Sequence, residues 1–179
     1  MPRRRSERVL FWGIIAGIIV ADLITKRIAV AQLVPRYVAH PVIGDWVQLR
    51  LVYNQGAAFG IYLGEYSRWI FIGLTIVAVV LLGRMFAHTA EGHRARIIAL
   101  AMVIGGALGN LIDRVRSAQG VVDFIDVGIG VHRWPTFNVA DMGVSIGAVL
   151  LAIVLWQEDE AAARAGAPAP APAGPERSA

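Results

Sequence analysis

Four long apolar blocks, separated by polar stretches, dominate the hydrophobic pattern of the chain. The blocks cover residues 9–34, 69–87, 97–112 and 137–156. A helix of about 20 apolar residues crosses the ~30 Å hydrocarbon layer of a bilayer, because each residue adds ~1.5 Å. The pattern therefore predicts four membrane-spanning helices, which places both termini on the same side of the membrane.

Two polar regions, residues 35–68 and 115–136, lie between the spans and share the opposite side. Residues 47–53 alternate apolar and polar side chains, a period of two that predicts a short strand, and residues 121–131 are a candidate for another. The predicted fold class is an all-α polytopic membrane protein, with four transmembrane helices and a small extracytoplasmic β-containing segment.

The two ends of the chain differ from its apolar middle. Residues 1–8 form a basic head that the positive-inside rule places in the cytoplasm. Residues 158–179 form an Ala/Pro-rich tail that is expected to be disordered on the same side, which leaves residues 9–157 as the membrane domain. A cleaved signal peptide ending at residues 29–31, which read A-x-A, is the alternative, but three further spans follow it.

Composition narrows the class of protein. Of the 179 residues, 56% are hydrophobic and only 17% are charged, which excludes an ordinary soluble domain. The net charge of +4 comes from scattered and terminal Lys and Arg, so nucleic-acid binding is not expected. The absence of cysteine excludes thiolate metal sites and cysteine nucleophiles. Glycines four residues apart favour close packing of helices within one bundle, at Gly13/Gly17, Gly105/Gly109 and Gly143/Gly147.

Charged and amide side chains inside the predicted spans are the strongest sign of function, since each charge costs about 2.5 to 3.5 kcal/mol to insert. Their spacing puts each of three sets on one helix face. The first and third helices run outward and the fourth runs inward, so the three sets converge at one depth near the outer surface. The sets are Asp22 with Lys26, Asn110 with Asp113 and Arg114, and Asn138 with Asp141.

Two carboxylates at that depth remain without a cation. Asp141 is one, and a loop carboxylate, Asp123 or Asp126, is the other. Two close carboxylates in a partly desolvated site share one proton, and such a pair can activate a water and protonate a leaving amine. The residues alone do not separate Asp123 from Asp126, and a helix cap is the structural alternative for Asp141. The remaining carboxylates are assigned local ion pairs, Asp22–Lys26 and Asp113–Arg114.

Rival chemistries have weaker support. No H-E-x-x-H motif occurs and the four histidines lie outside the spans, so an intramembrane zinc protease has no ligand set. A Ser145–Lys26 dyad needs a lysine that is already paired with Asp22. A small transporter or proton-relay protein with intramembrane carboxylates is the main alternative, but the inner halves of the spans are apolar. A structural scaffold packed through its glycines would tolerate loss of the aspartates.

Five short motifs occur in a fixed order between residues 8 and 157. They are Asp22-Leu23-Ile24-Thr25-Lys26, Asn54-Gln55-Gly56-Ala57-Ala58-Phe59, Gly109-Asn110-Leu111-Ile112-Asp113-Arg114, Val122-Asp123-Phe124 and Phe137-Asn138-Val139-Ala140-Asp141. Together they resemble the lipoprotein signal peptidases, the bacterial signal peptidase II family of aspartyl intramembrane proteases. Each motif is short, and the ordered set is what makes the resemblance specific.

The resemblance implies that Asp123 and Asp141 are the catalytic aspartates, because the family's V-D-F pattern falls on Asp123 and not on Asp126. A turn before Gly56 is the alternative role for Asn54. The resemblance also implies substrate-binding or site-organising roles for Asn54, Gly56, Asn110, Arg114 and Asn138, and a supporting polar core of Asp22, Lys26 and Asp113.

The implied substrate is a prolipoprotein with a diacylglyceryl-modified cysteine, which is cut just before that cysteine to release the signal peptide. The implied enzyme needs no metal or cofactor and lies in the bacterial cytoplasmic membrane among membrane lipids, with both termini inside and the active site near the outer face. We expect a monomer. Residues 46–66 are expected to lie on the membrane interface and close over the lipid. One aspartate would take a proton from water while the other polarises the scissile carbonyl; the sequence does not say which.

Overall fold

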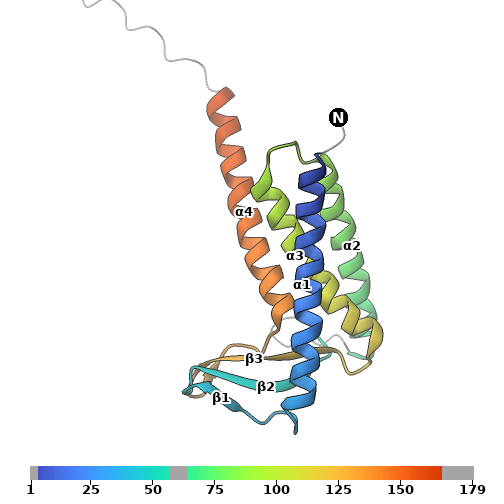
Figure 1. Cartoon of the computed structure of the whole chain (residues 1–179), viewed down its shortest axis with the longest axis vertical. Coiled ribbons are helices and arrows are strands. Elements are labelled where there is room, and N and C mark those ends of the chain that lie inside the picture. Colours follow the sequence, from blue (N-terminus) through green and yellow to red (C-terminus); the bar gives the residue numbers. More distant parts are fainter. Residues whose placement is uncertain (1–3, 57–63, 167–179) are drawn as a thin grey trace, which may run out of the picture.

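Four long helices form the membrane domain in the computed structural model, which describes residues 4–56 and 64–166 (Figure 1). They are α1 (Arg5–Gln32), α2 (Ser67–His88), α3 (Arg94–Arg116) and α4 (Val139–Gly166), with a 3₁₀ turn, η2 (Gly64–Tyr66), before α2. Each long helix contains a window apolar enough to cross a membrane. The prediction of four spans is confirmed, with most helix ends within a few residues of the apolar blocks.

α3 lies at the centre of the bundle and contacts α1, α2 and α4. Its glycines allow the close approach that their spacing predicts. A Cβ atom at Gly105 would lie 3.2 Å from atoms of α1, and one at Gly106 would overlap the backbone of α4. Gly147 of α4 packs as closely on α3. Among the described residues, nothing lies within 4 Å of a Cβ built at Gly13 or Gly17, so that face of α1 is open.

A small antiparallel sheet is the second part of the fold. Its strands, in spatial order, are β1 (His40–Ile43), β2 (Val47–Asn54), β3 (Val121–Ile129) and β4 (His132–Arg133). β2 confirms the strand predicted over residues 47–53, and β3 lies inside the candidate strand at 121–131. The short strands β1 and β4 were not predicted, because two to four residues are too few to show alternation.

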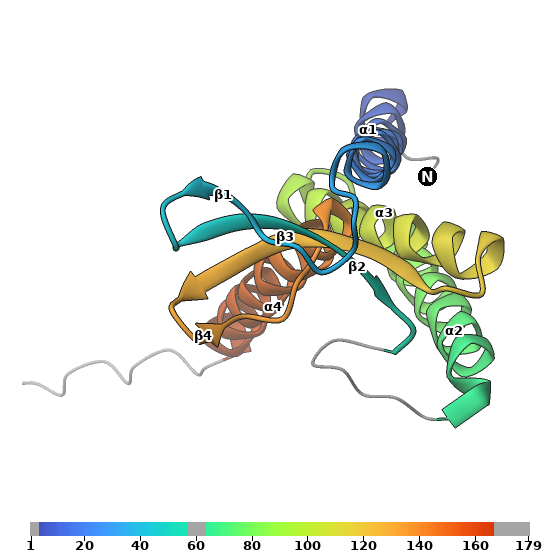
Figure 2. The same cartoon turned by 90° about the horizontal axis from the view of Figure 1, so that it is seen from below.

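The sheet lies across one end of the bundle, opposite the N-terminus and the far end of α4 (Figure 1). Seen from that end, its β1–β2 and β3–β4 turns project on the side away from α2 (Figure 2). Leu51 of β2 and Phe124 of β3 pack with Ala29 and Leu33 at the end of α1. This buried apolar cluster fixes β3 against the bundle and so positions its neighbour Asp123.

α4 is longer than the sequence pattern predicts. It continues past Trp156 to Gly166, so the expectation of disorder from residue 158 onward is wrong for residues 158–166. Alanine has the highest helix propensity, and Arg164 Nη2 donates to Glu160 Oε2 at 3.0 Å one turn away. The rest of the predicted tail, residues 167–179, lies outside the described residues, as do residues 57–63 of the segment expected to close over the lipid.

Candidate active site

Polar side chains from three helices and the sheet meet where β3 passes the first turn of α4. Asp123 lies on β3, opposite Val52 of β2 in the register, and its side chain is buried, with the residue 2% exposed. Asp141 lies in the first turn of α4. Both residues line the same cavity, so the structure brings together the two aspartates that the resemblance singles out.

Asn138, a fully buried residue just before α4, connects the two carboxyl groups. Its Nδ2 donates to Asp123 Oδ1 at 2.6 Å, and its backbone N–H donates to Asp141 Oδ2 at 3.2 Å. Asn138 Oδ1 accepts a hydrogen bond from the backbone N–H of Asp141 at 2.9 Å. This reciprocal pattern is a capping box that starts α4. Asp141 therefore has the capping role considered from the sequence, and the same bonds hold it beside Asp123.

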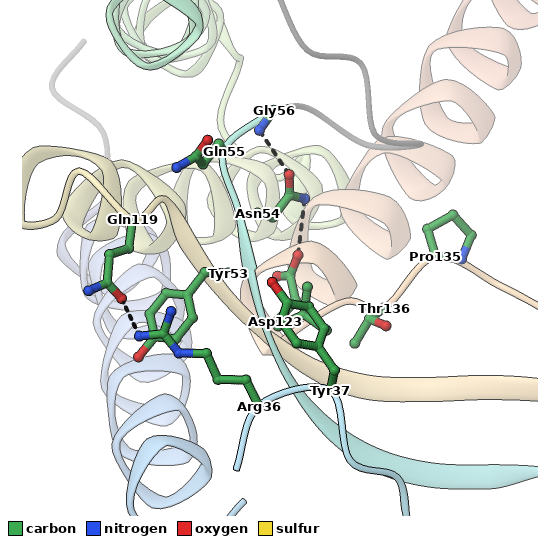
Figure 3. Close-up of a pocket in the computed structure, with 11 residues that line it drawn as sticks. Arg36, Tyr37, Tyr53, Asn54, Gln55, Gly56, Gln119, Asp123, Pro135 and Thr136 are labelled. Carbon is green, nitrogen blue, oxygen red and sulfur yellow. Dashed lines mark hydrogen bonds between the residues drawn. The ribbon is translucent and has the colours of Figure 1, made fainter. Parts of the chain in front are cut away.

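Asn54, the last residue of β2, forms the turn before Gly56 and also contacts Asp123. Its Nδ2 donates to Asp123 Oδ2 at 3.0 Å, and its Oδ1 accepts from the backbone N–H of Gly56 at 3.0 Å (Figure 3). The second bond closes an Asx turn. The turn orients the Asn54 amide, so that its NH₂ group faces the carboxyl group of Asp123.

Lys26 is 3% exposed and is surrounded by polar partners. Its Nζ lies 2.7 Å from Asp22 Oδ2, 2.8 Å from Asp113 Oδ2 and 3.0 Å from Asn110 Oδ1. The predicted Asp22–Lys26 ion pair is confirmed. The predicted Asp113–Arg114 pair is wrong, because Asp113 instead pairs with Lys26 across the interface between α1 and α3.

The Asn110 amide links this charged group to Asp141. Its Oδ1 accepts from Lys26 and also from Asn138 Nδ2 at 3.1 Å, while its Nδ2 donates to Asp141 Oδ1 at 2.7 Å. Two donors meet at the amide oxygen, so the NH₂ group must face Asp141. Lys26 and Asn138 together therefore orient the Asn110 amide toward the carboxylate of Asp141.

Arg114 lines the same cavity from α3. Its Nη2 donates to the Gly56 carbonyl at 3.0 Å, and its guanidinium carbon lies 5.6 Å from the centroid of the Phe71 ring. Its buried Nε has no hydrogen-bond partner among the residues that the structure describes. The guanidinium thus holds the chain at Gly56, beside the cavity.

Asp126 is separated from this site, although composition did not distinguish it from Asp123. It lies three residues further along β3, and residues an odd number apart point to opposite faces of a strand. Its carboxylate is 2.7 Å from Arg133 Nε and 2.9 Å from Arg50 Nη2. Asp126 is therefore held in an ion-pair network of the sheet.

A cavity of about 540 Å³ opens beside the two aspartates. Its polar wall consists of Asn54, Asn110, Arg114, Asp123 and Asp141, and its apolar wall of Trp134, Phe137, Met142, Val144 and Ile146. Ser145 also lines it. The three donors of Lys26 are directed at other side chains, so the structure does not support a Ser145–Lys26 dyad.

Sequence reasoning missed the loop before α4 as part of the site. Trp134, Pro135 and Thr136 line the cavity, although none of them is an ionisable residue in a span. Their only signal in the sequence is position, directly before the motif that begins at Phe137. Sequence reasoning also missed Arg36, which lines a neighbouring cavity.

The electrostatics of Asp123 suit a carboxyl group that keeps its proton. Burial raises the pKa of Asp123 to about 7, and the nearby Asp141 carboxylate adds to the rise. Hydrogen bonds from Asn54 and Asn138 lower this pKa and offset part of the effect. Asp123 therefore keeps its proton to a higher pH than an ordinary aspartate, beside a second carboxyl group that lines the same cavity.

The chain is similar to proteins of known function along most of its length. Residues 14–157 match the family described as signal peptidase (SPase) II. The lipoprotein signal peptidase of Rhodococcus jostii is 44% identical over 165 residues, which cover 86% of this chain and 75% of that protein. The lipoprotein signal peptidase of Xanthomonas oryzae pv. oryzae is 35% identical over 155 residues, 86% of this chain and 93% of that protein. A bacterial membrane enzyme solved by the in meso method has a TM-score of 0.74 and 33% identity, over 83% of this chain and 88% of that chain.

Proposed function

Because the chain belongs to the signal peptidase II family, we propose that Asp123 and Asp141 are the catalytic pair of its aspartic peptidase activity. That activity removes signal peptides from prolipoproteins in a bacterial membrane. The observation that carries the assignment is the Asn138 bridge, which holds a buried carboxyl group beside a second one at the edge of a cavity. No other pair of carboxyl groups within residues 4–56 and 64–166 lines that cavity.

In the proposed mechanism Asp123 is the acid and Asp141 the base. Protonated Asp123 donates to the oxygen of the scissile carbonyl while ionised Asp141 takes a proton from the attacking water. When the tetrahedral intermediate collapses, Asp141 gives its proton to the leaving amine and Asp123 recovers its own from the intermediate. The assignment is supported by the raised pKa of Asp123.

The remaining polar residues position this pair. Asn138 and Asn110 orient Asp141, Asn54 orients Asp123, and Lys26 acts on Asp141 through Asn110. In this proposal the guanidinium of Arg114, which lines the cavity, binds a backbone carbonyl of the substrate. Asp22 and Asp113 neutralise Lys26.

The substrate is proposed to be a prolipoprotein whose cysteine carries a diacylglyceryl group, cut just before that cysteine. The support is the two-sided cavity, because its polar wall suits a peptide bond and its apolar wall on α4 suits acyl chains. The test offers the purified protein a lipidated prolipoprotein and its unlipidated twin. We expect cleavage of the lipidated form alone. Equal cleavage of both forms would contradict the proposal that the enzyme recognises the diacylglyceryl group.

The sheet is proposed to lie on the outer face of the membrane, with both chain ends in the cytoplasm. The basic head supports this orientation. The chain has no cysteine, so a single introduced thiol reports on one position. A membrane-impermeant maleimide should label His132→Cys, at the β3–β4 turn, in spheroplasts, but Ala90→Cys, between α2 and α3, only after permeabilisation. The reverse labelling pattern would show that the sheet lies on the cytoplasmic side, contrary to the proposal.

Cleavage should slow at alkaline pH, because the proposed acid loses its proton there. The pKa of Asp123 is raised to about 7, so the protonated fraction, and with it kcat/KM, falls about tenfold per pH unit above that value. Asn54 lowers this pKa through its hydrogen bond. Asn54→Ala should therefore move the falling limb to higher pH in a pH–rate profile. Recovery of the rate on return to neutral pH is the control for denaturation. If Asn54→Ala leaves the alkaline limb at the same pH, a group other than Asp123 causes the fall in kcat/KM.

A further inference from the structure

A second cavity, of about 560 Å³, shares Asp123 with the first. Figure 3 shows the side chains that line this second cavity. Asn54, Asp123, Pro135 and Thr136 line both cavities. The aspartate proposed as the acid therefore faces two spaces. The first has an apolar wall formed by α4, and the second is bordered by the connections at the sheet end of the bundle.

The second cavity is lined by a cation, the guanidinium of Arg36. The guanidinium carbon of Arg36, in the connection after α1, lies 4.2 Å from the centroid of the Tyr53 ring. Arg36 Nη2 also donates to Gln119 Oε1 at 2.8 Å, in the connection after α3 (Figure 3). Stacking and one hydrogen bond restrict the side chain and leave other N–H donors available. Within the described residues no carboxylate forms an ion pair with Arg36.

A prolipoprotein presents two different flanks to the site, if the proposed function is correct. The signal peptide before the cleavage point is apolar, and the mature chain after the lipidated cysteine is polar. The two cavities differ in the same way and meet at the proposed acid. With the scissile bond at Asp123, the signal peptide and the acyl chains match the first cavity, and the polar residues after the lipidated cysteine match the second.

We propose that the second cavity is the binding site for the residues that directly follow the lipidated cysteine, and that Arg36 favours an acidic side chain among them. A guanidinium offers several N–H donors in a fixed fork that matches a carboxylate. The same charge disfavours lysine or arginine at these positions. The cavity thus gives the enzyme a preference on the side of the cut that does not carry the signal peptide.

The test compares three lipidated substrates that differ only in the two residues after the lipidated cysteine, which are Asp, Ser or Lys. In zwitterionic detergent the wild-type kcat/KM should be about tenfold higher for Asp than for Lys, as expected for a partly exposed ion pair and its like-charge counterpart. Arg36→Gln should bring this ratio close to one, and Arg36→Glu should invert it. Arg116→Gln removes an equal charge from an exposed position at the end of α3, outside both cavities, and should keep the wild-type ratio.

Equal cleavage of the three substrates by the wild-type protein would overturn this inference and leave the proposed function intact. A ratio that persists in Arg36→Gln, or that disappears equally in Arg116→Gln, would also overturn it, because the preference would then come from the general field of the protein. Failure to cut any lipidated substrate would instead contradict the proposed function. The absence of a wild-type ratio overturns the inference even if a variant fails to fold.

Discussion

Asp123→Asn and Asp141→Asn should each lower cleavage of a diacylglyceryl-modified prolipoprotein by about 10³-fold or more. An amide can neither donate a carboxyl proton nor accept one from water, and a positioned acid or base contributes typically about 10²- to 10⁴-fold. The amides keep the size of the side chains, so the cavity should survive. The measurement is the initial rate of signal-peptide release by purified protein in detergent. The double variant should be no slower than the slower single variant, since the pair acts as a unit.

Asp126→Asn is the matched control for this experiment. It makes the same change on the same strand, but Asp126 pairs with Arg50 and Arg133 and lies outside the cavity. Because it leaves two arginines without a buried partner, it should lower the apparent Tm and keep most of the cleavage rate at permissive temperature. Near-normal cleavage by either Asp123→Asn or Asp141→Asn would contradict the proposed mechanism.

Lys26→Met should destabilise the fold more than any surface change. It leaves Asp22 and Asp113 as unpaired carboxylates in the bundle, and breaking a buried ion pair costs about 3 to 5 kcal/mol. Asp22 Oδ1 also accepts a hydrogen bond from the backbone N–H of Ala140 at 2.9 Å. A displaced Asp22 side chain would therefore also disturb the first turn of α4. A drop in apparent Tm of about 10 °C is expected in detergent. A Lys26→Met protein that melts like wild type would show that the charges are not coupled to stability.

The triple variant Lys26→Met, Asp22→Asn, Asp113→Asn separates stability from positioning. With no buried charge left unpaired, much of the lost Tm should return. Cleavage should stay below the wild-type rate, because one of the two donors that orient the Asn110 amide toward Asp141 is still missing. Recovery of both Tm and rate would mean that Lys26 has no part in orienting Asn110.

Most of the architecture was predictable because it depends on local patterns. The length of an apolar block predicts a span, and the alternation at residues 47–53 predicts β2. The Ala/Pro-rich composition of the tail predicts disorder, but its first part continues α4 to Gly166. The reason is that alanine favours helix. β1 and β4 form because they pair with β2 and β3. Segments this short carry no pattern in their own sequence that predicts such pairing.

The candidate site was predictable in its members and less so in its contacts. Spacing gave the Asp22–Lys26 pair, because both residues lie on one helix face. Asp113 was assigned to Arg114 because the two are adjacent, but neighbouring residues on a helix point about 100° apart, and tertiary packing turns Asp113 toward Lys26. The choice between Asp123 and Asp126 depends on which face of β3 meets the bundle. Without the family resemblance, the sequence pattern does not supply that information.

In the proposed mechanism Asp123 carries the proton of the pair, and infrared difference spectroscopy can detect that proton. The spectrum taken at about pH 5 minus that at about pH 9 should contain a protonated-carboxyl band that titrates near pH 7. This band should be missing from Asp123→Asn and retained in Asp126→Asn. A band that persists unchanged in Asp123→Asn, or no such band in the wild-type protein, would contradict this assignment.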